Sequence, residues 1–117
     1  MSLTRLDLEI PPARIPHHLQ VLLDETSDDL ADWQGTRDRN EFVPADYVLV
    51  LDALFALRPR MEGRNPVFLE WGSGLGVVTL MAAALGWRAT GIEIQPGLVG
   101  KSLQYARAFD LPARFLT

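Results

Sequence analysis

The sequence predicts an α/β fold with a parallel sheet, because its second half alternates strand and helix patterns around a glycine turn. From Pro66 onward an apolar run leads through this turn to an apolar helix pattern, a second apolar run, a polar turn and an amphipathic helix pattern. A third short strand pattern ends at Leu116. This βαβαβ order is typical of parallel strands joined by crossover helices.

The N-terminal part predicts helices that precede the sheet. Apolar residues at helical spacing over 16–33, interleaved with acids, predict the first helix, and the polar stretch 34–43 predicts a loop. We expect residues 1–43 to form an N-terminal helical cap or extension, since they are too few to bury a core alone. His17 and His18 are adjacent on this helix and face different directions, so no metal site is expected.

Pro44 predicts the start of a second helix, because proline suits the first helical turn and an apolar face follows it. We expect this helix to end before Pro59. Arg58, Arg60 and Arg64 lie near that end, where the helix dipole favours positive charge. We therefore interpret these arginines as cap and linker charges, in preference to a substrate patch.

The remaining elements are expected where apolar runs alternate with glycine and polar turns. The predicted strands and helices are, in order, strand 67–71, helix 77–85, strand 88–93, helix 98–109 and strand 113–116.

Composition and charge restrict the range of functions. The chain has 117 residues, 48% hydrophobic and 22% charged, which is ordinary globular composition. It contains no cysteine, which excludes disulfides and thiolate metal sites, and we expect a cytoplasmic location. No leader-like segment and no apolar run of membrane-spanning length is present, so no membrane association is expected. The net charge of −4 disfavours nucleic acid as a partner.

The glycine turn carries the clearest functional signal. The first strand contains Glu70 and is followed by Gly72, Ser73, Gly74 and Gly76, with glycine at every second position. Glycine permits positive φ and close approach of the backbone to a ligand, and the next helix begins with unpaired N–H groups. The turn therefore predicts a site for a nucleotide-like ligand. A tight turn that binds nothing is the alternative.

A second acid, Glu93, ends the next strand. In doubly wound sheets an acid about 20 residues after the glycine turn accepts hydrogen bonds from ribose hydroxyls. Because the carboxyl ends of neighbouring parallel strands meet at one edge of a sheet, Glu93 is expected to lie beside the glycine turn.

Details of the turn select among ribose-bearing cofactors. The dinucleotide fingerprint G-x-G-x-x-G fails, because its third glycine position holds Val77 or Thr79, depending on the register. The Lys-Ser/Thr pair of a P-loop is also missing. Glu70, two residues before the first glycine, would repel a pyrophosphate but suits an ammonium or sulfonium group. The turn therefore favours a cationic cofactor over a dinucleotide.

In these residues the sequence resembles class I S-adenosylmethionine-dependent methyltransferases. Residues 67–76 are similar to the first motif of that family, residues 91–96 (GIEIQP) are similar to its second, and the likeness covers residues 66–117. The resemblance implies that residues 44–117 are the N-terminal half of an S-adenosylmethionine-binding, Rossmann-like domain. The predicted sheet is incomplete relative to the seven strands of the family.

The resemblance also implies roles for individual residues. The glycine turn would pack under the methionine and ribose parts of the cofactor, with Glu70 near its amino group. Glu93 would bind the ribose hydroxyls, Ile94 would pack on the adenine, and the helix that carries Tyr47 would close over the site. The implied cofactor-binding residues are Glu70, Gly72, Ser73, Gly74, Gly76, Glu93 and Ile94. Trp71 offers a π face to a sulfonium, but we expect it to be a core or loop-packing residue.

Three functions stay open: a methyltransferase or its cofactor-binding part, an NAD- or nucleotide-binding domain, and a non-catalytic interaction module. The acceptor is not identified, with a protein or small molecule favoured over nucleic acid. No catalytic residue is named, because the family places its acceptor-orienting group after a fourth strand. The first strand, central in the family, is expected here to be an open edge. Such an edge predicts either a longer methyltransferase or self-association.

Overall fold

The computed structural model describes residues 3–12, 15–34 and 45–117. Its elements follow the predicted order of two N-terminal helices and a βαβαβ unit, with a short 3₁₀ helix between them. They are α1 (His17–Gln34), α2 (Tyr47–Leu57), η2 (Arg58–Met61), β1 (Val67–Trp71), α3 (Val77–Ala84), β2 (Arg88–Ile92), α4 (Pro96–Ala108) and β3 (Arg114–Leu116).

The three strands form a parallel sheet in the order β1-β2-β3. β1 pairs with β2 so that Glu70 lies opposite Gly91, and β2 pairs with β3 so that Gly91 lies opposite Phe115. β1 is thus an edge strand of this sheet, as the sequence predicts. The architecture is α/β and consistent with an incomplete Rossmann-like fold.

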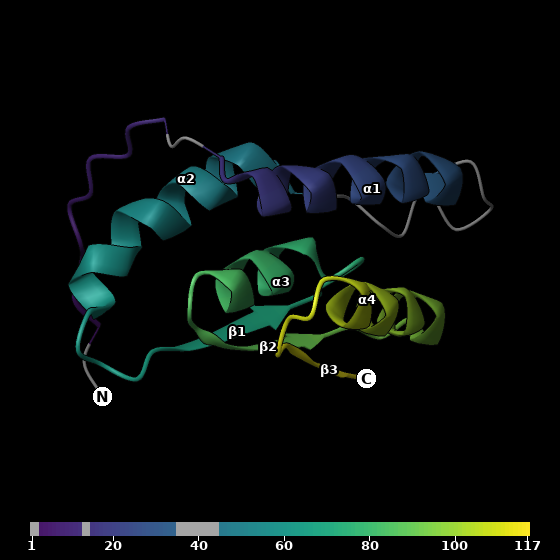
Figure 1. The fold of residues 1–117 in the computed structure, drawn as a ribbon. Helices are drawn as coiled ribbons and strands as arrows, with labels where there is room; N and C mark the ends of the chain where they lie inside the picture. Colours follow the sequence, from purple (N-terminus) through teal and green to yellow (C-terminus); the bar gives the residue numbers. More distant parts are fainter. Residues whose placement is uncertain (1–2, 13–14, 35–44) are drawn as a thin grey trace.

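The helices cover one face of the sheet (Figure 1). α3 lies between the sheet and the outer helices α1 and α2, and α4 lies beside α3 near β3. On the opposite face the side chains of Val67, Leu69 and Trp71 are 69%, 57% and 82% exposed. We call these three side chains of β1 the bare face.

The hydrophobic core lies between the helices and the covered face of the sheet. α1 contributes Leu19 and Leu22, α2 contributes Leu51, and α3 contributes Leu80 and Met81, all of which are fully buried. Each such side chain stabilises the fold by about 1.5–3 kcal/mol. The N-terminal helix is therefore part of the same core as the βαβαβ unit.

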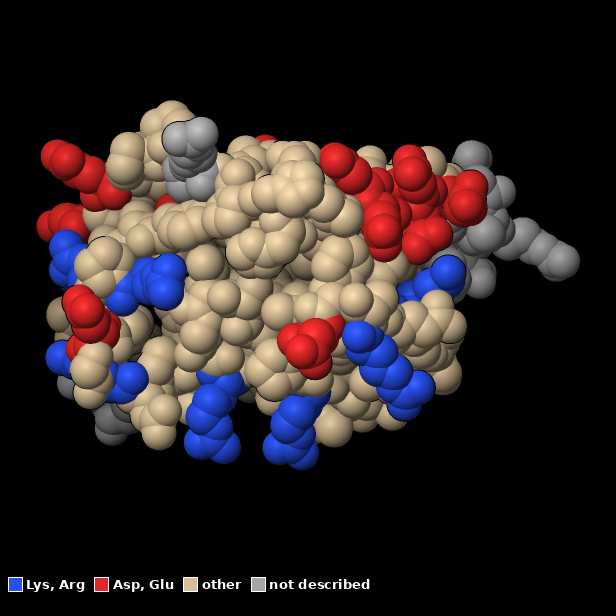
Figure 2. All heavy atoms as spheres, viewed as in Figure 1, with Lys and Arg blue, Asp and Glu red and all other residues tan. Residues whose placement is uncertain are grey.

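α1 is also tied to α4 by polar contacts. The Tyr105 hydroxyl donates a hydrogen bond to Asp29 Oδ2, and Lys101 Nζ lies 3.9 Å from the same oxygen. α1 carries five acids in its sequence, and Figure 2 shows Asp and Glu side chains gathered over its C-terminal half. These contacts attach the outer helix to the helix that follows β2.

Several element boundaries differ from the sequence prediction. α2 begins at Tyr47, because the Asp46 carboxylate caps it by accepting the N–H of Leu49 at 3.1 Å. The predicted start at Pro44 lies outside the described residues. The prediction that the second helix ends before Pro59 is confirmed, because α2 ends at Leu57. A separate 3₁₀ helix, η2, then runs from Arg58 to Met61 with proline in its first turn, where proline is tolerated.

Two further predictions concern the other helices. α4 begins at Pro96 rather than at residue 98, with proline again in the first turn. The predicted loop 34–43 lies outside the described residues apart from Gln34, which ends α1. Among the described helices, none combines the length and the apolar character that crossing a membrane requires.

Candidate functional site

The glycine turn joins β1 to α3 at the carboxyl edge of the sheet. Gly72, Gly74 and Gly76 all adopt positive φ, at 77°, 55° and 80°. The N–H groups of Gly72 and Ser73 donate to the carbonyl oxygen of Ile92 at 2.8 and 2.9 Å. These bonds bring the turn against the end of β2, which is the neighbourhood that the sequence predicts.

Position 76 favours glycine for two reasons: its positive φ and the lack of room for a Cβ atom. A Cβ atom built on it would lie 2.6 Å from Ser102 Oγ and 2.7 Å from Phe115 Cε1, contacts too short for any real side chain. Ser102 belongs to α4 and Phe115 to β3. The third glycine of the turn is therefore the point where α3, α4 and β3 approach one another.

Gly91 in β2 allows the turn to close on the sheet. A Cβ atom there would lie 2.7 Å from Ser73 Cβ and 2.8 Å from Thr79 Oγ1. Ser73 itself is buried, and its Oγ has no hydrogen-bond partner within the described residues. Such an orphaned hydroxyl at the centre of the turn is a group that water or a ligand would satisfy.

Glu70 caps the N-terminus of α3 from the neighbouring strand. Its Oε2 accepts the N–H of Thr79 at 3.0 Å and the Thr79 hydroxyl at 2.6 Å. The N-cap residue of α3 is Gly76, which has no side chain to do this. A carboxylate in this place is favoured by the positive end of the helix dipole.

The site carries an excess of negative charge. Burial raises the pKa of the Glu70 carboxyl, the two hydrogen bonds from Thr79 oppose that rise, and the nearby Glu93 carboxylate adds to it. Burial, with the charge of Glu70 adding to it, also raises the pKa of Tyr47 to about 12. Tyr47 opens α2, so this helix begins close to Glu70, and a cation bound here would relieve the repulsion.

Glu93 follows β2 directly and is 7% exposed. Its Oε2 accepts the N–H of Gly74 at 2.8 Å, and its Oε1 accepts the N–H of Gln95 at 3.0 Å. Each carboxylate oxygen has about two acceptor positions, so one position on each remains. The carboxylate is held in one orientation between the glycine turn and the start of α4.

The implied cofactor-binding residues lie together at the carboxyl edge of the sheet. One prediction about a neighbouring aromatic residue differs from the structure. The prediction that Trp71 is a core or loop-packing residue is wrong, because alternation along β1 places it on the bare face, 82% exposed. Ile94 is 85% exposed beside Glu93. It is thus an apolar side chain free to cover a ligand at this edge.

The sequence did not predict which groups donate hydrogen bonds to the carboxylates of Glu70 and Glu93. In the sequence, Thr79 stands only where the dinucleotide fingerprint would require a glycine, yet it binds Glu70 through both its N–H and its hydroxyl. Thr79 is the third residue of α3, whereas a capping box has Ser or Thr at the N-cap, so no local pattern indicated that Thr79 would bind Glu70.

Two cavities of the structure lie away from the carboxyl edge. The described residues form cavities of about 380 and 450 Å³, and neither includes the glycine turn, Glu70 or Glu93. In the same part of the chain no three His, Asp or Glu side chains are grouped to hold a metal ion. No protein-family model matches the sequence, and the comparison with curated proteins gives no match.

Proposed function

We propose that the chain binds S-adenosylmethionine at the carboxyl edge of β1 and β2, as the cofactor-binding part of a methyltransferase. The observation that carries the proposal is the pair of carboxylates, Glu70 and Glu93, on either side of a turn with three left-handed glycines. Their mutual repulsion favours a ligand that is cationic at one end. Ribose hydroxyls at its other end would find an oriented acceptor in Glu93.

The residues fit this cofactor in three respects. Glu93 is fixed by the N–H groups of Gly74 and Gln95 and keeps acceptor capacity on both oxygens. The exposed side chain of Ile94 offers apolar cover for an adenine ring. The buried Ser73 hydroxyl lacks a partner among the described residues.

When bound, S-adenosylmethionine supplies a methyl group on a sulfonium centre. Transfer of that group is an in-line displacement, so the protein's task is to align the acceptor and exclude water. In this proposal Glu70 attracts the cationic end, the glycine turn supports the backbone of the ligand, and Glu93 fixes the ribose. No described residue is assigned to proton transfer.

The proposal extends to the acceptor and the location. The net charge of −4 favours a protein or a small molecule over nucleic acid as methyl acceptor. A cytoplasmic location is proposed on the cysteine-free sequence.

An NAD- or nucleotide-binding domain is the less favoured alternative. A pyrophosphate at the glycine turn would face the carboxylates of Glu70 and Glu93, and the fingerprint glycine is replaced by Val77 or Thr79. Burial is the main cause of the raised pKa of Glu70, and the nearby Glu93 carboxylate adds to it, so a further negative charge at this edge would be unfavourable.

Isothermal titration with S-adenosylmethionine, S-adenosylhomocysteine and NAD tests the proposal. We expect saturable binding of the first two ligands and none of NAD. Gly74→Asp should abolish binding, because a third carboxylate enters the turn. Gly100→Asp is the matched control: Gly100 is exposed on α4, with open space where a Cβ would lie, and should bind as the parent does.

Two results would contradict the proposal. One is a folded parent chain that gives no heat with either adenosyl ligand at millimolar concentration. The other is binding that persists unchanged in Gly74→Asp, which would place the ligand elsewhere on the molecule.

An interaction module is the second candidate, and the bare face favours it. Val67, Leu69 and Trp71 expose large apolar side chains side by side on a strand that also lies at the sheet edge. Unpaired edge strands with apolar faces promote association between chains. Self-association through β1 would appear in sedimentation velocity as a concentration-dependent dimer, and a monomer at all concentrations would count against it.

A further inference from the structure

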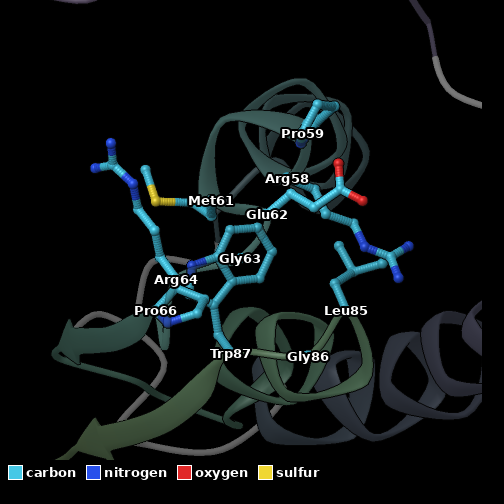
Figure 3. Close-up of a pocket in the computed structure, with 10 residues that line it drawn as sticks. All are labelled: Arg58, Pro59, Met61, Glu62, Gly63, Arg64, Pro66, Leu85, Gly86 and Trp87. Carbon is cyan, nitrogen blue, oxygen red and sulfur yellow. The ribbon is translucent and has the colours of Figure 1, made fainter.

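A cavity of about 380 Å³ opens at the amino edge of the sheet, at the opposite end from the glycine turn (Figure 3). It lies between η2, the turn that leads into β1, and the turn that joins α3 to β2. Its volume is within the range of about 300–1,000 Å³ typical of small-molecule sites. None of the residues proposed to bind the cofactor lines it.

The walls of the cavity are apolar and include one large aromatic ring. Trp87 is 8% exposed, and its indole lies in the middle of the group of lining side chains (Figure 3). Met61 and Leu85 flank it, with Pro59 and Pro66 completing the apolar lining. A flat apolar ligand body would therefore contact side chains that the fold already holds in place.

The rim of the cavity is charged. Arg58 and Arg64 are exposed, and in Figure 3 their guanidinium groups lie on two sides of the Trp87 ring. Across residues 3–12, 15–34 and 45–117, neither forms an ion pair. Arg60 differs from them, because it donates to the backbone oxygen of Asp7 at 3.2 Å. Two guanidinium groups are thus available to an incoming ligand.

Arg58 is the C-cap residue of α2, and Arg58 and Arg60 lie in the last turn of η2, as the interpretation of these arginines as cap charges expects. Within the described residues, neither Arg58 nor Arg64 donates a side-chain hydrogen bond to a carbonyl at the end of α2 or η2. Glu62 also lines the rim, so the lining carries two positive charges and one negative charge. That balance suits a monoanion better than a dianion.

We propose that this cavity binds a small organic monoanion with a planar apolar body, an aromatic carboxylate being the simplest example. The ring of the ligand lies against Trp87, and the carboxylate accepts hydrogen bonds from the guanidinium group of Arg58, while Arg64 on the other side of the ring adds a positive charge. Guanidinium groups recognise carboxylates in this way through paired N–H donors. This site is independent of the proposed cofactor site.

The test uses 2-naphthoate as the probe and the neutral 2-naphthamide as its matched control, followed in ¹H–¹⁵N spectra of the whole chain. We expect 2-naphthoate to shift the Trp87 indole N–H and the amides of Gly63 and Gly86 saturably, without shifting those of residues 72–76. Arg58→Gln should weaken binding about tenfold, the effect of losing one charged hydrogen bond, and Arg64→Gln should weaken it by a smaller factor. Arg107→Gln, exposed on α4, should leave the affinity unchanged.

The neutral amide distinguishes recognition of the ligand's charge from nonspecific hydrophobic binding. Binding of 2-naphthamide as tight as that of 2-naphthoate would overturn the proposal, and so would unchanged affinity in both arginine variants. Shifts confined to β1 would also overturn it, because they would place the probe on the bare face. Both arginines are exposed, so their variants are expected to fold.

Discussion

The two ends of the small parallel sheet are built in opposite ways. At the carboxyl edge the charged side chains are turned inward, and Glu70 and Glu93 together accept four hydrogen bonds from Thr79, Gly74 and Gln95. At the amino edge Arg58 and Arg64 stand exposed, with no ion pair among the described residues. Charge at the carboxyl edge therefore makes hydrogen bonds within the fold, while charge at the amino edge is exposed to solvent.

The largest expected difference between the two edges is in the stability lost when a glycine is replaced. The two glycines compared have similar backbone conformations. Gly76 has φ 80° and Gly63 has φ 73°, but only Gly76 lacks space for a Cβ. Gly63→Ala should lower the free energy of unfolding by about 1–2 kcal/mol through backbone strain. Gly76→Ala should lower it by about 2–5 kcal/mol, because overlap with Ser102 and Phe115 adds to that strain. Urea unfolding measures both, and equal losses would contradict the described packing.

Removal of one charge at each edge of the sheet should also change the free energy of unfolding by unequal amounts. Glu93→Gln places an amide NH₂ group against the N–H of Gly74 or Gln95 and should lower the free energy of unfolding by about 1–3 kcal/mol. Arg64→Gln removes an exposed charge and should change it by no more than about 0.5 kcal/mol. A larger effect for Arg64→Gln in the same urea titrations would show that this arginine supports the fold.

The pH dependence of the free energy of unfolding tests the raised pKa of Glu70 at the carboxyl edge. The pKa of Glu70 is raised in the folded state, chiefly by burial, so between its unfolded and folded pKa values the folded chain binds more protons. The contribution of Glu70 to stability is therefore most favourable at low pH and declines as pH rises through the folded pKa. Glu70→Gln should remove that decline when free energies of unfolding are compared from about pH 4 to 8. A constant difference between parent and variant over that range would contradict the raised pKa.

An equally small effect on the stability of the monomer is expected on the bare face. Trp71→Thr keeps a residue suited to a strand and removes a side chain that is 82% exposed, so the free energy of unfolding should change by no more than about 0.5 kcal/mol. If β1 mediates self-association, the same variant should weaken the dimer in sedimentation velocity. A marked loss of monomer stability would show that Trp71 packs within its own chain.

The sequence predicted those parts of the fold that depend on the local pattern of apolar and turn residues. Apolar runs and turns predict the three strands and the crossover helices, and the geometry of parallel strands places Glu93 beside the glycine turn. The exposure of Trp71 was not predictable in this way, because it depends on which face of the sheet the helices cover. The cavity beside Trp87 likewise depends on η2, the short 3₁₀ helix after α2, which the sequence did not predict.

The close approach of Gly91 to the glycine turn links the identities of residues that are distant in the sequence. A side chain at position 91 would require smaller residues at positions 73 and 79 at once. A change at position 79 would in turn remove the hydroxyl that donates to Glu70. Substitutions at positions 70, 73, 79 and 91 are therefore expected to covary among homologous sequences, so that a replacement tolerated at one of them depends on the residues at the other three.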